Sequence, residues 1–187
     1  EKPLADRLDG VDDLQQEVRD RKLVAVVGYQ LRFHPCLQRL ERLLMQRAVG
    51  RLLTVQIATA EHLPYWHRYE DYRSSYAARR ELGGGVVLSQ IHELDYAQWL
   101  FGMPRRLFAV GGHLSQLDVN VEDTASILMD VPCDGRTLPI HVHQDFVQKR
   151  RVRRCRVVGE DGVIAVDLLA STLAVTNAAA LGANVAD

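Results

Sequence analysis

The sequence has few cysteines and lacks any long apolar run. Its 187 residues include three cysteines, Cys36, Cys133 and Cys155, which lie far apart and form no CxxC pair. This pattern excludes a disulfide framework and a structural zinc site, and it favours a reducing, cytoplasmic setting. No apolar run approaches the roughly 18 to 20 residues of a membrane helix, and the first thirty residues lack the apolar centre of a signal peptide. We therefore expect no contact with a membrane.

The sequence also lacks a net charge of either sign. Its 23 basic and 24 acidic residues leave a formal charge of -1, so no overall field favours nucleic acid as a partner. The basic run KRRVRRCR at 149–156 is interpreted as a solvated strand face, with binding of a nucleotide-sugar phosphate or an acidic partner as the alternative. Small neutral or weakly charged molecules remain the expected partners.

The N-terminal part shows helix and buried-strand patterns. Apolar residues recur every three or four positions among charged residues over 4–21, which predicts an amphipathic surface helix. The run LVAVVGYQLRF at 23–33 is continuous and rich in β-branched residues, as is typical of a parallel strand buried on both faces. A second helix is predicted over 37–46.

The remainder predicts a strand, a long loop, a helix and then several strands. LLTVQIATA at 52–60 resembles a strand, and the aromatic segment 62–82 resembles a functional loop with a short helix. The glycines at 83–85 open a helix expected to continue through Phe101. Further strand-like runs, separated by the turn signals CDGR and GEDG, occupy 106–114, 123–131, 138–146, 153–158 and 163–169. Consecutive strands without intervening helices predict an α+β fold with an open, mostly antiparallel β-sheet and helices on one face.

Lys2 precedes Pro3, and a residue before proline is biased towards extended geometry. This bias favours a lysine at the end of a strand, where ligands bind in doubly wound folds. Partial burial would lower its pKa enough for proton transfer near neutral pH. The alternative is an exposed lysine, which is the usual location of this residue type.

His92 follows the triple glycine, which permits close approach of the backbone to another group. Asp95 lies three residues further on and thus on the same helical face as His92. A carboxylate beside a histidine orients the imidazole and stabilises its protonated form, as proton transfer requires. A histidine that is hydrogen-bonded within a core is the structural alternative.

Three potential metal ligands alternate along one expected strand. His141, His143 and Asp145 therefore share one face of that strand. No fourth ligand lies near them in the sequence, so we predict no metal site.

Taken in order, several motifs resemble one protein family. EKP, GYQLRFHP, the aromatic loop, ELGGGVVLSQIHELDYAQWLFG, VEDTASILM and VVGEDGVIAVD are similar to successive motifs of the Gfo/Idh/MocA oxidoreductases. The resemblance implies a C-terminal α+β domain over 37–177, preceded by a remnant of a dinucleotide-binding (Rossmann) domain over 1–36. That remnant is expected to supply the last β-α-β piece of a Rossmann-like domain, and 178–187 is expected to be a ragged tail.

The resemblance also implies roles for individual residues. Lys2 resembles the family's catalytic lysine, and with Pro3 it is expected to lie beside the NAD or NADP cofactor. His92 resembles the acid/base histidine, and Asp95 resembles the carboxylate that accompanies it. Residues expected to line the cleft or to hold the sugar-like substrate are Arg32, His34, Trp66, His67 and Tyr72.

Two departures from the family pattern matter. The family often has an aspartate three or four residues before the histidine, where this chain has Ser89 and Leu88. Without that carboxylate raising the pKa of His92, we expect the rate of the intact enzyme to rise with pH through a value nearer 6.5 than 8. No GxGxxG motif precedes Lys2, so we expect either a fragment of a longer enzyme or a truncated relative, which alone binds no nicotinamide cofactor.

The leading hypothesis is part of an oxidoreductase that transfers a hydride between NAD(P) and a hydroxyl or carbonyl of a sugar, inositol or nucleotide-sugar-like substrate. The alternative is a non-catalytic module for sugar binding or oligomerisation that has lost its cofactor domain. In either case the open sheet is expected to form a homodimer or a higher homo-oligomer.

Overall fold

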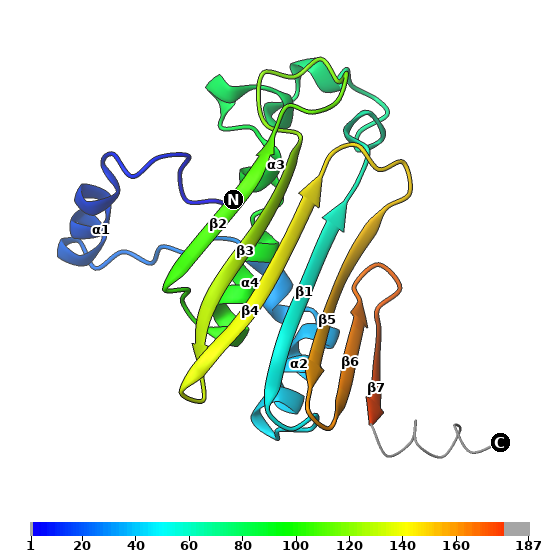
Figure 1. The fold of residues 1–187 in the computed structure, drawn as a ribbon. Coiled ribbons are helices and arrows are strands. Elements are labelled where there is room, and N and C mark those ends of the chain that lie inside the picture. Colours follow the sequence, from blue (N-terminus) through cyan, green and yellow to red (C-terminus); the bar gives the residue numbers. More distant parts are fainter. Residues whose placement is uncertain (1, 178–187) are drawn as a thin grey trace.

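A twisted sheet forms the centre of the protein (Figure 1). The computed structural model describes residues 2–177, and its sheet has the strand order β2-β3-β4-β1-β5-β6-β7. Only β1 and β4 pair in parallel, and the other neighbours are antiparallel. The strands are β1 (Leu52–Ala60), β2 (Arg106–Gly112), β3 (Thr124–Cys133), β4 (Arg136–Asp145), β5 (Val152–Gly159), β6 (Gly162–Asp167) and β7 (Thr172–Asn177).

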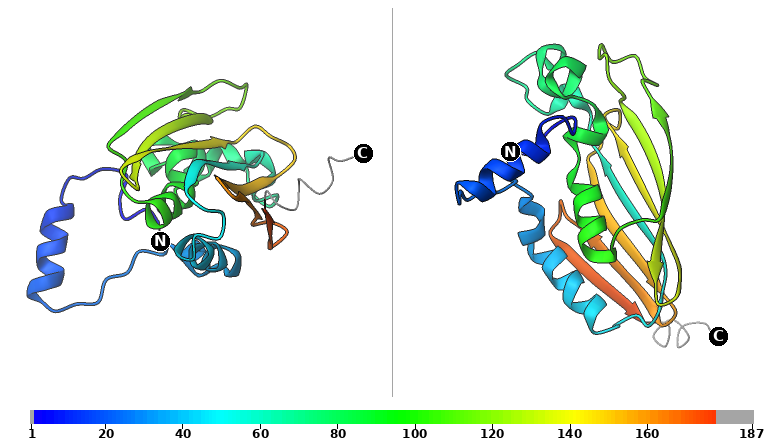
Figure 2. Two further views of the ribbon diagram at one scale, coloured as in Figure 1. Left: turned by 60° about the horizontal axis from the view of Figure 1, so that its bottom comes forward. Right: turned by 90° about the vertical axis from the view of Figure 1, so that its left-hand side faces the viewer.

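The long helices cover one face of this sheet, as the right-hand view of Figure 2 shows. They are α2 (Pro35–Met45) and α4 (His92–Phe101). Leu37 and Leu40 of α2 and Tyr96 of α4 are fully buried, and they form one core with the inward side chains of the strands. The fold is therefore α+β, with an open, mostly antiparallel sheet and helices on one face, as predicted.

Strand alternation separates the two faces of the sheet. In β3, Ile127 and Met129 point into the core, whereas Leu128 between them is 52% exposed. Leu128 lies opposite His141 of β4 and Phe108 of β2, so these residues share the face that the helices leave uncovered. We call this uncovered side the open face.

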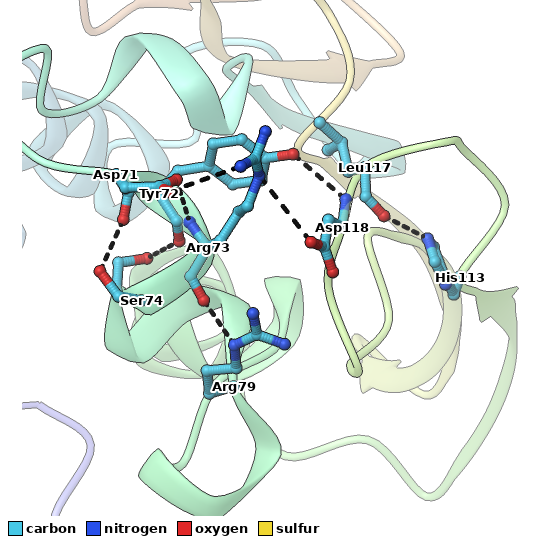
Figure 3. A network of polar contacts seen from close by, with 9 residues as sticks. Asp71, Tyr72, Arg73, Ser74, Arg79, His113, Leu117 and Asp118 are labelled. Atoms are coloured by element: carbon cyan, nitrogen blue, oxygen red, sulfur yellow. Dashed lines mark hydrogen bonds and ion pairs between the residues drawn. The ribbon is translucent and has the colours of Figure 1, made fainter.

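The aromatic segment predicted as a loop forms four short 3-10 turns. These are η2 (Leu63–Tyr65), η3 (Tyr72–Ser74), η4 (Tyr76–Ala78) and η5 (Arg80–Leu82). A second, smaller core lies beneath them and includes Leu63, Val86 and Phe146. The turns are also tied to the segment that follows β2, where the Tyr72 hydroxyl accepts a hydrogen bond from the Asp118 amide at 3.2 Å (Figure 3).

The strand predicted at 23–33 is not formed. The helix before it, α1 (Val11–Asp20), begins later than predicted and has no buried residue, and both views of Figure 2 show it apart from the sheet. Val24 is 93% exposed and Val26 is 83% exposed, and only the 3-10 turn η1 (Gln30–Phe33) follows. A strand needs hydrogen-bonding neighbours, and none of the strands within residues 2–177 pairs with this segment.

Two further details differ from the sequence prediction. The helix expected to run through Phe101 is divided into α3 (Val86–Ser89) and α4, because the backbone leaves helical geometry at Gln90. β7 was not predicted, since its exposed residues lack a clear apolar alternation. The proposed domain boundary between residues 36 and 37 stays a prediction, and the predicted tail 178–187 lies outside the described residues.

A buried ion pair joins α4 to the sheet. Glu93 in the first turn of α4 is fully buried, and its carboxylate accepts hydrogen bonds from Arg153 Nε at 2.8 Å and Nη2 at 3.1 Å. Arg153 belongs to β5 and its side chain is 26% exposed. This paired geometry satisfies both carboxylate oxygens in a place that water scarcely reaches.

Replacing Glu93 tests this connection. Glu93→Gln removes one partner and leaves the Arg153 guanidinium without its counter-charge, so we expect the free energy of unfolding to fall by about 3 kcal/mol. Urea denaturation followed by circular dichroism measures the change. Glu160→Gln is the matched control because Glu160 forms an exposed ion pair with Arg51, and it should have a much smaller effect. Equal losses for the two variants would contradict the assigned importance of the buried pair.

Candidate functional site

A polar pocket lies at the edge of the sheet where β1 ends and β5 begins. Its volume is about 360 Å³. Segments that are distant in the sequence line it: Lys2, Thr59, Glu61, Trp66, His67, Tyr76, Ser89, Gln90, His92, Arg151 and Arg153. The structure therefore brings Lys2 and His92, which are separated by ninety positions, to a common cavity.

The division between α3 and α4 positions both residues. At the end of α3 the Ser89 carbonyl accepts a hydrogen bond from Lys2 Nζ. The next carbonyl, that of Gln90, accepts one from Gln144 Nε2 at 2.6 Å. Carbonyl groups at the end of a helix lack partners within the helix, so these two side chains satisfy them. His92 then begins α4 directly beside the lysine.

The triple glycine makes the close approach that its sequence predicts. A Cβ atom at Gly84 would collide with backbone carbonyls of the η4 region, and one at Gly85 would collide with the Glu122 carboxylate. Gly85 also has a φ of 108°, which disfavours other residues. Glu122 in turn accepts a hydrogen bond from the Val87 amide at 3.1 Å, which fixes the start of α3.

His92 is uncharged at neutral pH. The residue is only 4% exposed. Burial is the main cause that lowers the pKa of His92 to about 4, and the positive charges of Lys2 and Arg153 add to the effect. This value lies below 6.5 because burial and the nearby cations act in addition to the missing carboxylate, and the expected pH dependence of the rate stays a prediction. His92 Nδ1 is buried and has no hydrogen-bond partner among the described residues.

Other lining residues also have buried polar atoms without a protein partner. Within residues 2–177 these atoms include Trp66 Nε1, Ser89 Oγ and Gln90 Oε1. Buried polar groups in native proteins are normally hydrogen-bonded, to protein, water or a ligand. These three atoms and His92 Nδ1 therefore belong to residues around one cavity.

Asp95 does not orient His92, contrary to the expectation from their spacing. Its two carboxylate oxygens accept hydrogen bonds from Arg32 Nε at 2.9 Å and Nη2 at 2.6 Å. The Arg32 guanidinium also lies near the rings of Tyr29 and Trp99. Arg32 and Asp95 therefore connect η1 to α4, and neither lines the pocket.

The other predicted substrate residues divide into two groups. Trp66 and His67 line the pocket, and His67 contacts Glu70 at 2.6 Å. His34 Nδ1 instead accepts a hydrogen bond from the Cys36 amide at 3.2 Å, and this contact caps the start of α2. The Tyr72 hydroxyl accepts a hydrogen bond from the Asp118 amide, within the polar network of Figure 3. Tyr72 does not line the pocket.

His141, His143 and Asp145 do not form a metal centre. His143 bridges the Ser126 hydroxyl at 2.9 Å and Asp145 at 3.1 Å on the open face. Within residues 2–177 no group of three histidine, cysteine or acidic side chains is arranged to hold a metal ion.

Several lining residues were not predicted from the sequence. Arg151 and Arg153 belong to the basic run that was interpreted as a solvated strand face, yet both line the pocket. Thr59 and Glu61 carry no recognisable motif. Burial raises the pKa of Glu93, and the charge of Arg153 opposes this rise. The clustering of basic residues was a sequence signal for the two arginines, whereas no sequence signal indicated that Arg153 pairs with Glu93.

The fold is similar to part of two solved oxidoreductase structures. The sequence model described as the GFO/IDH/MocA C-terminal domain matches residues 37–165, and the chain belongs to this family. The predicted resemblance is thereby confirmed.

Curated relatives of the chain are dehydrogenases. The chain is 27% identical over 134 residues to trans-1,2-dihydrobenzene-1,2-diol dehydrogenase of Bos taurus, covering 71% of this chain and 37% of that protein. For the Oryctolagus cuniculus enzyme of the same name, identity is 26% over 168 residues, covering 87% and 46%. The chain thus spans less than half the length of these relatives.

Two solved structures have the same fold. The WlbA dehydrogenase from Bordetella pertussis, in complex with NADH and UDP-GlcNAcA, is similar with a TM-score of 0.79 and 19% identity, covering 95% of this chain and 54% of that one. An oxidoreductase from Agrobacterium radiobacter, in complex with NAD+, L-tartaric acid and magnesium, has a TM-score of 0.75 and 20% identity, covering 95% and 50%.

The protonation of His92 can be measured directly. We expect its imidazole to titrate near pH 4 in NMR spectra, and His92→Gln assigns the resonance. An unfolded histidine binds a proton near pH 6.5, so the folded state should lose stability as the pH falls from there towards 4. Lys2→Met should raise the pKa of His92, whereas Lys22→Met, which removes a charge outside the pocket lining, should not. A titration near 6.5 would show that the side chain is not buried among cations.

Proposed function

We propose that this chain forms the substrate-binding half of an NAD(P)-dependent oxidoreductase that acts on a secondary hydroxyl of a sugar, inositol or nucleotide-sugar-like molecule. The observation that carries the proposal is the meeting of Lys2 and uncharged His92 in one pocket with unsatisfied polar atoms. The family membership of residues 37–165 supports it.

Each of the two residues has a distinct role in oxidation of the substrate. Neutral His92 accepts the proton of the reacting hydroxyl, and the Lys2 ammonium stabilises the negative charge that develops on the oxygen. That negative charge offsets the cations around His92 and raises its affinity for the proton during the reaction. In the reverse direction the same proton returns from His92 to the carbonyl oxygen.

A bound nicotinamide cofactor would supply the acceptor or the donor of the hydride. Lys2 and Pro3 are the residues of this chain that we place beside it. The described residues contain no strand followed by a glycine-rich turn and a helix, so they do not by themselves fit a dinucleotide, and cofactor affinity requires a further domain. The free cysteines support a cytoplasmic, reducing setting.

The experiment is a kinetic analysis of a protein in which this chain is joined to a dinucleotide-binding domain. Lys2→Met and His92→Ala should each lower kcat by about 100-fold to 10,000-fold, because each removes a proton acceptor or a stabilising charge. Cofactor affinity should change little. Lys22→Met is the control for loss of a lysine outside the pocket. Near-normal turnover by His92→Ala would refute the role of His92.

We also propose that the open face pairs with a second copy of the chain. Helices cover one side of the sheet, whereas Phe108, Val110 and Leu128 on the other side are exposed by 68%, 60% and 52%. A second copy can cover such a face symmetrically.

Sedimentation equilibrium tests this pairing. We expect a discrete dimer at tens of micromolar, and Leu128→Arg should dissociate it because the charge lies on the open face between β2 and β4. Leu14→Arg, on exposed α1, is the matched control and should leave the dimer intact. A monomer, or a dimer unaffected by Leu128→Arg, would contradict the proposal.

A further inference from the structure

A polar side chain occupies a core position of β4. The residues on the buried face of this strand are Leu138, Ile140, Val142 and Gln144, and each is at most 1% exposed. The first three belong to the apolar core. Burial of the amide of Gln144 costs free energy unless the amide is hydrogen-bonded, and an apolar side chain of similar size would avoid this cost. The contact that the amide makes is therefore of interest.

That contact is with the junction between α3 and α4. Gln144 Nε2 donates a hydrogen bond to the Gln90 carbonyl at 2.6 Å. In an uninterrupted α-helix this carbonyl would accept a hydrogen bond from the Leu94 amide, four residues further on. Here it accepts from the Gln144 side chain and, at 3.4 Å, from the Glu93 amide. The side chain of Gln144 thus uses the acceptor that a continuous helix would need.

The junction determines the direction in which His92 points. The backbone at Gln90 has a φ of -106° and a ψ of 35°, and α4 begins two residues later at His92. A continuous helix advances by a fixed rotation per residue, so loss of the junction would turn every later side chain relative to α3. Gln144 does not line the pocket. It therefore acts on the pocket through the backbone of Gln90.

We propose that Gln144 is a positioning residue for His92, because its side-chain amide keeps α3 and α4 separate and so holds the imidazole in the pocket beside Lys2. The catalytic consequence of this role rests on the proposed function, whereas the structural role does not.

Hydrogen exchange in the 187-residue chain tests the structural role. Gln144→Met removes the donor and keeps a long, unbranched side chain in the core. We expect the Leu94 amide to exchange about tenfold more slowly in this variant, because the Gln90 carbonyl becomes available to it. General loosening of the core would instead accelerate exchange. Residue-resolved exchange measured by NMR therefore separates the two explanations by the sign of the change.

The titration of His92 reports the same displacement. In the unaltered chain the pKa of His92 is lowered to about 4, mainly by burial and also by Lys2 and Arg153. Gln144→Met should raise this pKa, because the imidazole leaves its buried place near these cations. An NMR titration of the variant measures the shift.

Leu138→Met is the matched control. It also places a methionine at a fully buried position of β4, and Leu138 does not contact the junction through a hydrogen bond. Both the exchange of Leu94 and the titration of His92 should stay as in the unaltered chain.

Gln144→Glu is a conservative rescue. Burial raises the pKa of a carboxyl group, so the new side chain should be protonated near pH 5, and its hydroxyl can donate to the Gln90 carbonyl. At that pH we expect the Leu94 amide to exchange as in the unaltered chain. If Gln144→Met does not fold, the unaltered chain still decides the matter, because one side-chain amide proton of Gln144 should exchange slowly with solvent.

Kinetics of the protein joined to a dinucleotide-binding domain test the catalytic consequence. Gln144→Met should lower kcat by about 10-fold to 100-fold, since a small misplacement of a reacting group has an effect of this size. Cofactor affinity should change little, and Leu138→Met should have near-normal turnover.

The inference is overturned if Gln144→Met leaves the Leu94 exchange and the His92 titration unchanged, or if Leu138→Met alters them equally. It is also overturned if both side-chain amide protons of Gln144 exchange rapidly. None of these results affects the proposed function, which His92→Ala tests. Normal turnover by Gln144→Met despite a displaced His92 would instead refute the role of His92 in the proposed function and leave the structural role of Gln144 intact.

Discussion

The buried pairing of Glu93 with Arg153 is the constraint on which the pocket depends. It fixes the first turn of α4 against the beginning of β5, and both ends of this connection reach the cavity, through His92 and through Arg153 itself. Desolvation makes two buried charges costly unless they stay together, so the pair tolerates little displacement of the helix along the sheet. The position of α4, which carries His92, is therefore fixed relative to β5, which carries Arg153.

A second pairing supports the same helix from its other side. Arg32 and Asp95 connect η1 to α4, and Lys2 reaches the end of α3. Residues that precede the matched family domain thus contact the helices of that domain at several points. These contacts give the segment before residue 37 a structural role that its exposed apolar residues do not reveal.

The sheet was largely predictable from the sequence because alternation of buried and exposed residues is a local property. β1 and the strands from β3 to β6 follow it, and turn residues mark their ends. The site was predictable only where a motif existed, as for Lys2 and His92. Side-chain partners that only the tertiary structure determines were not predictable. The spacing of His92 and Asp95 suggests a contact, yet Asp95 accepts hydrogen bonds from Arg32. The continuous apolar run at 23–33 was misleading, since a strand requires neighbours that its own sequence cannot specify.

The parallel pairing of β1 with β4 has a consequence for how this family can change. Because β5 runs antiparallel to β1, the ends of β1 and β4 and the start of β5 meet at one edge, where the pocket lies. The connections that leave this edge, at 61–85 and 146–151, form much of its wall. Insertions or substitutions there can alter ligand preference while the hydrogen-bond ladder stays untouched. The part of the lining that lies in these connections can thus diverge while the paired strands are maintained.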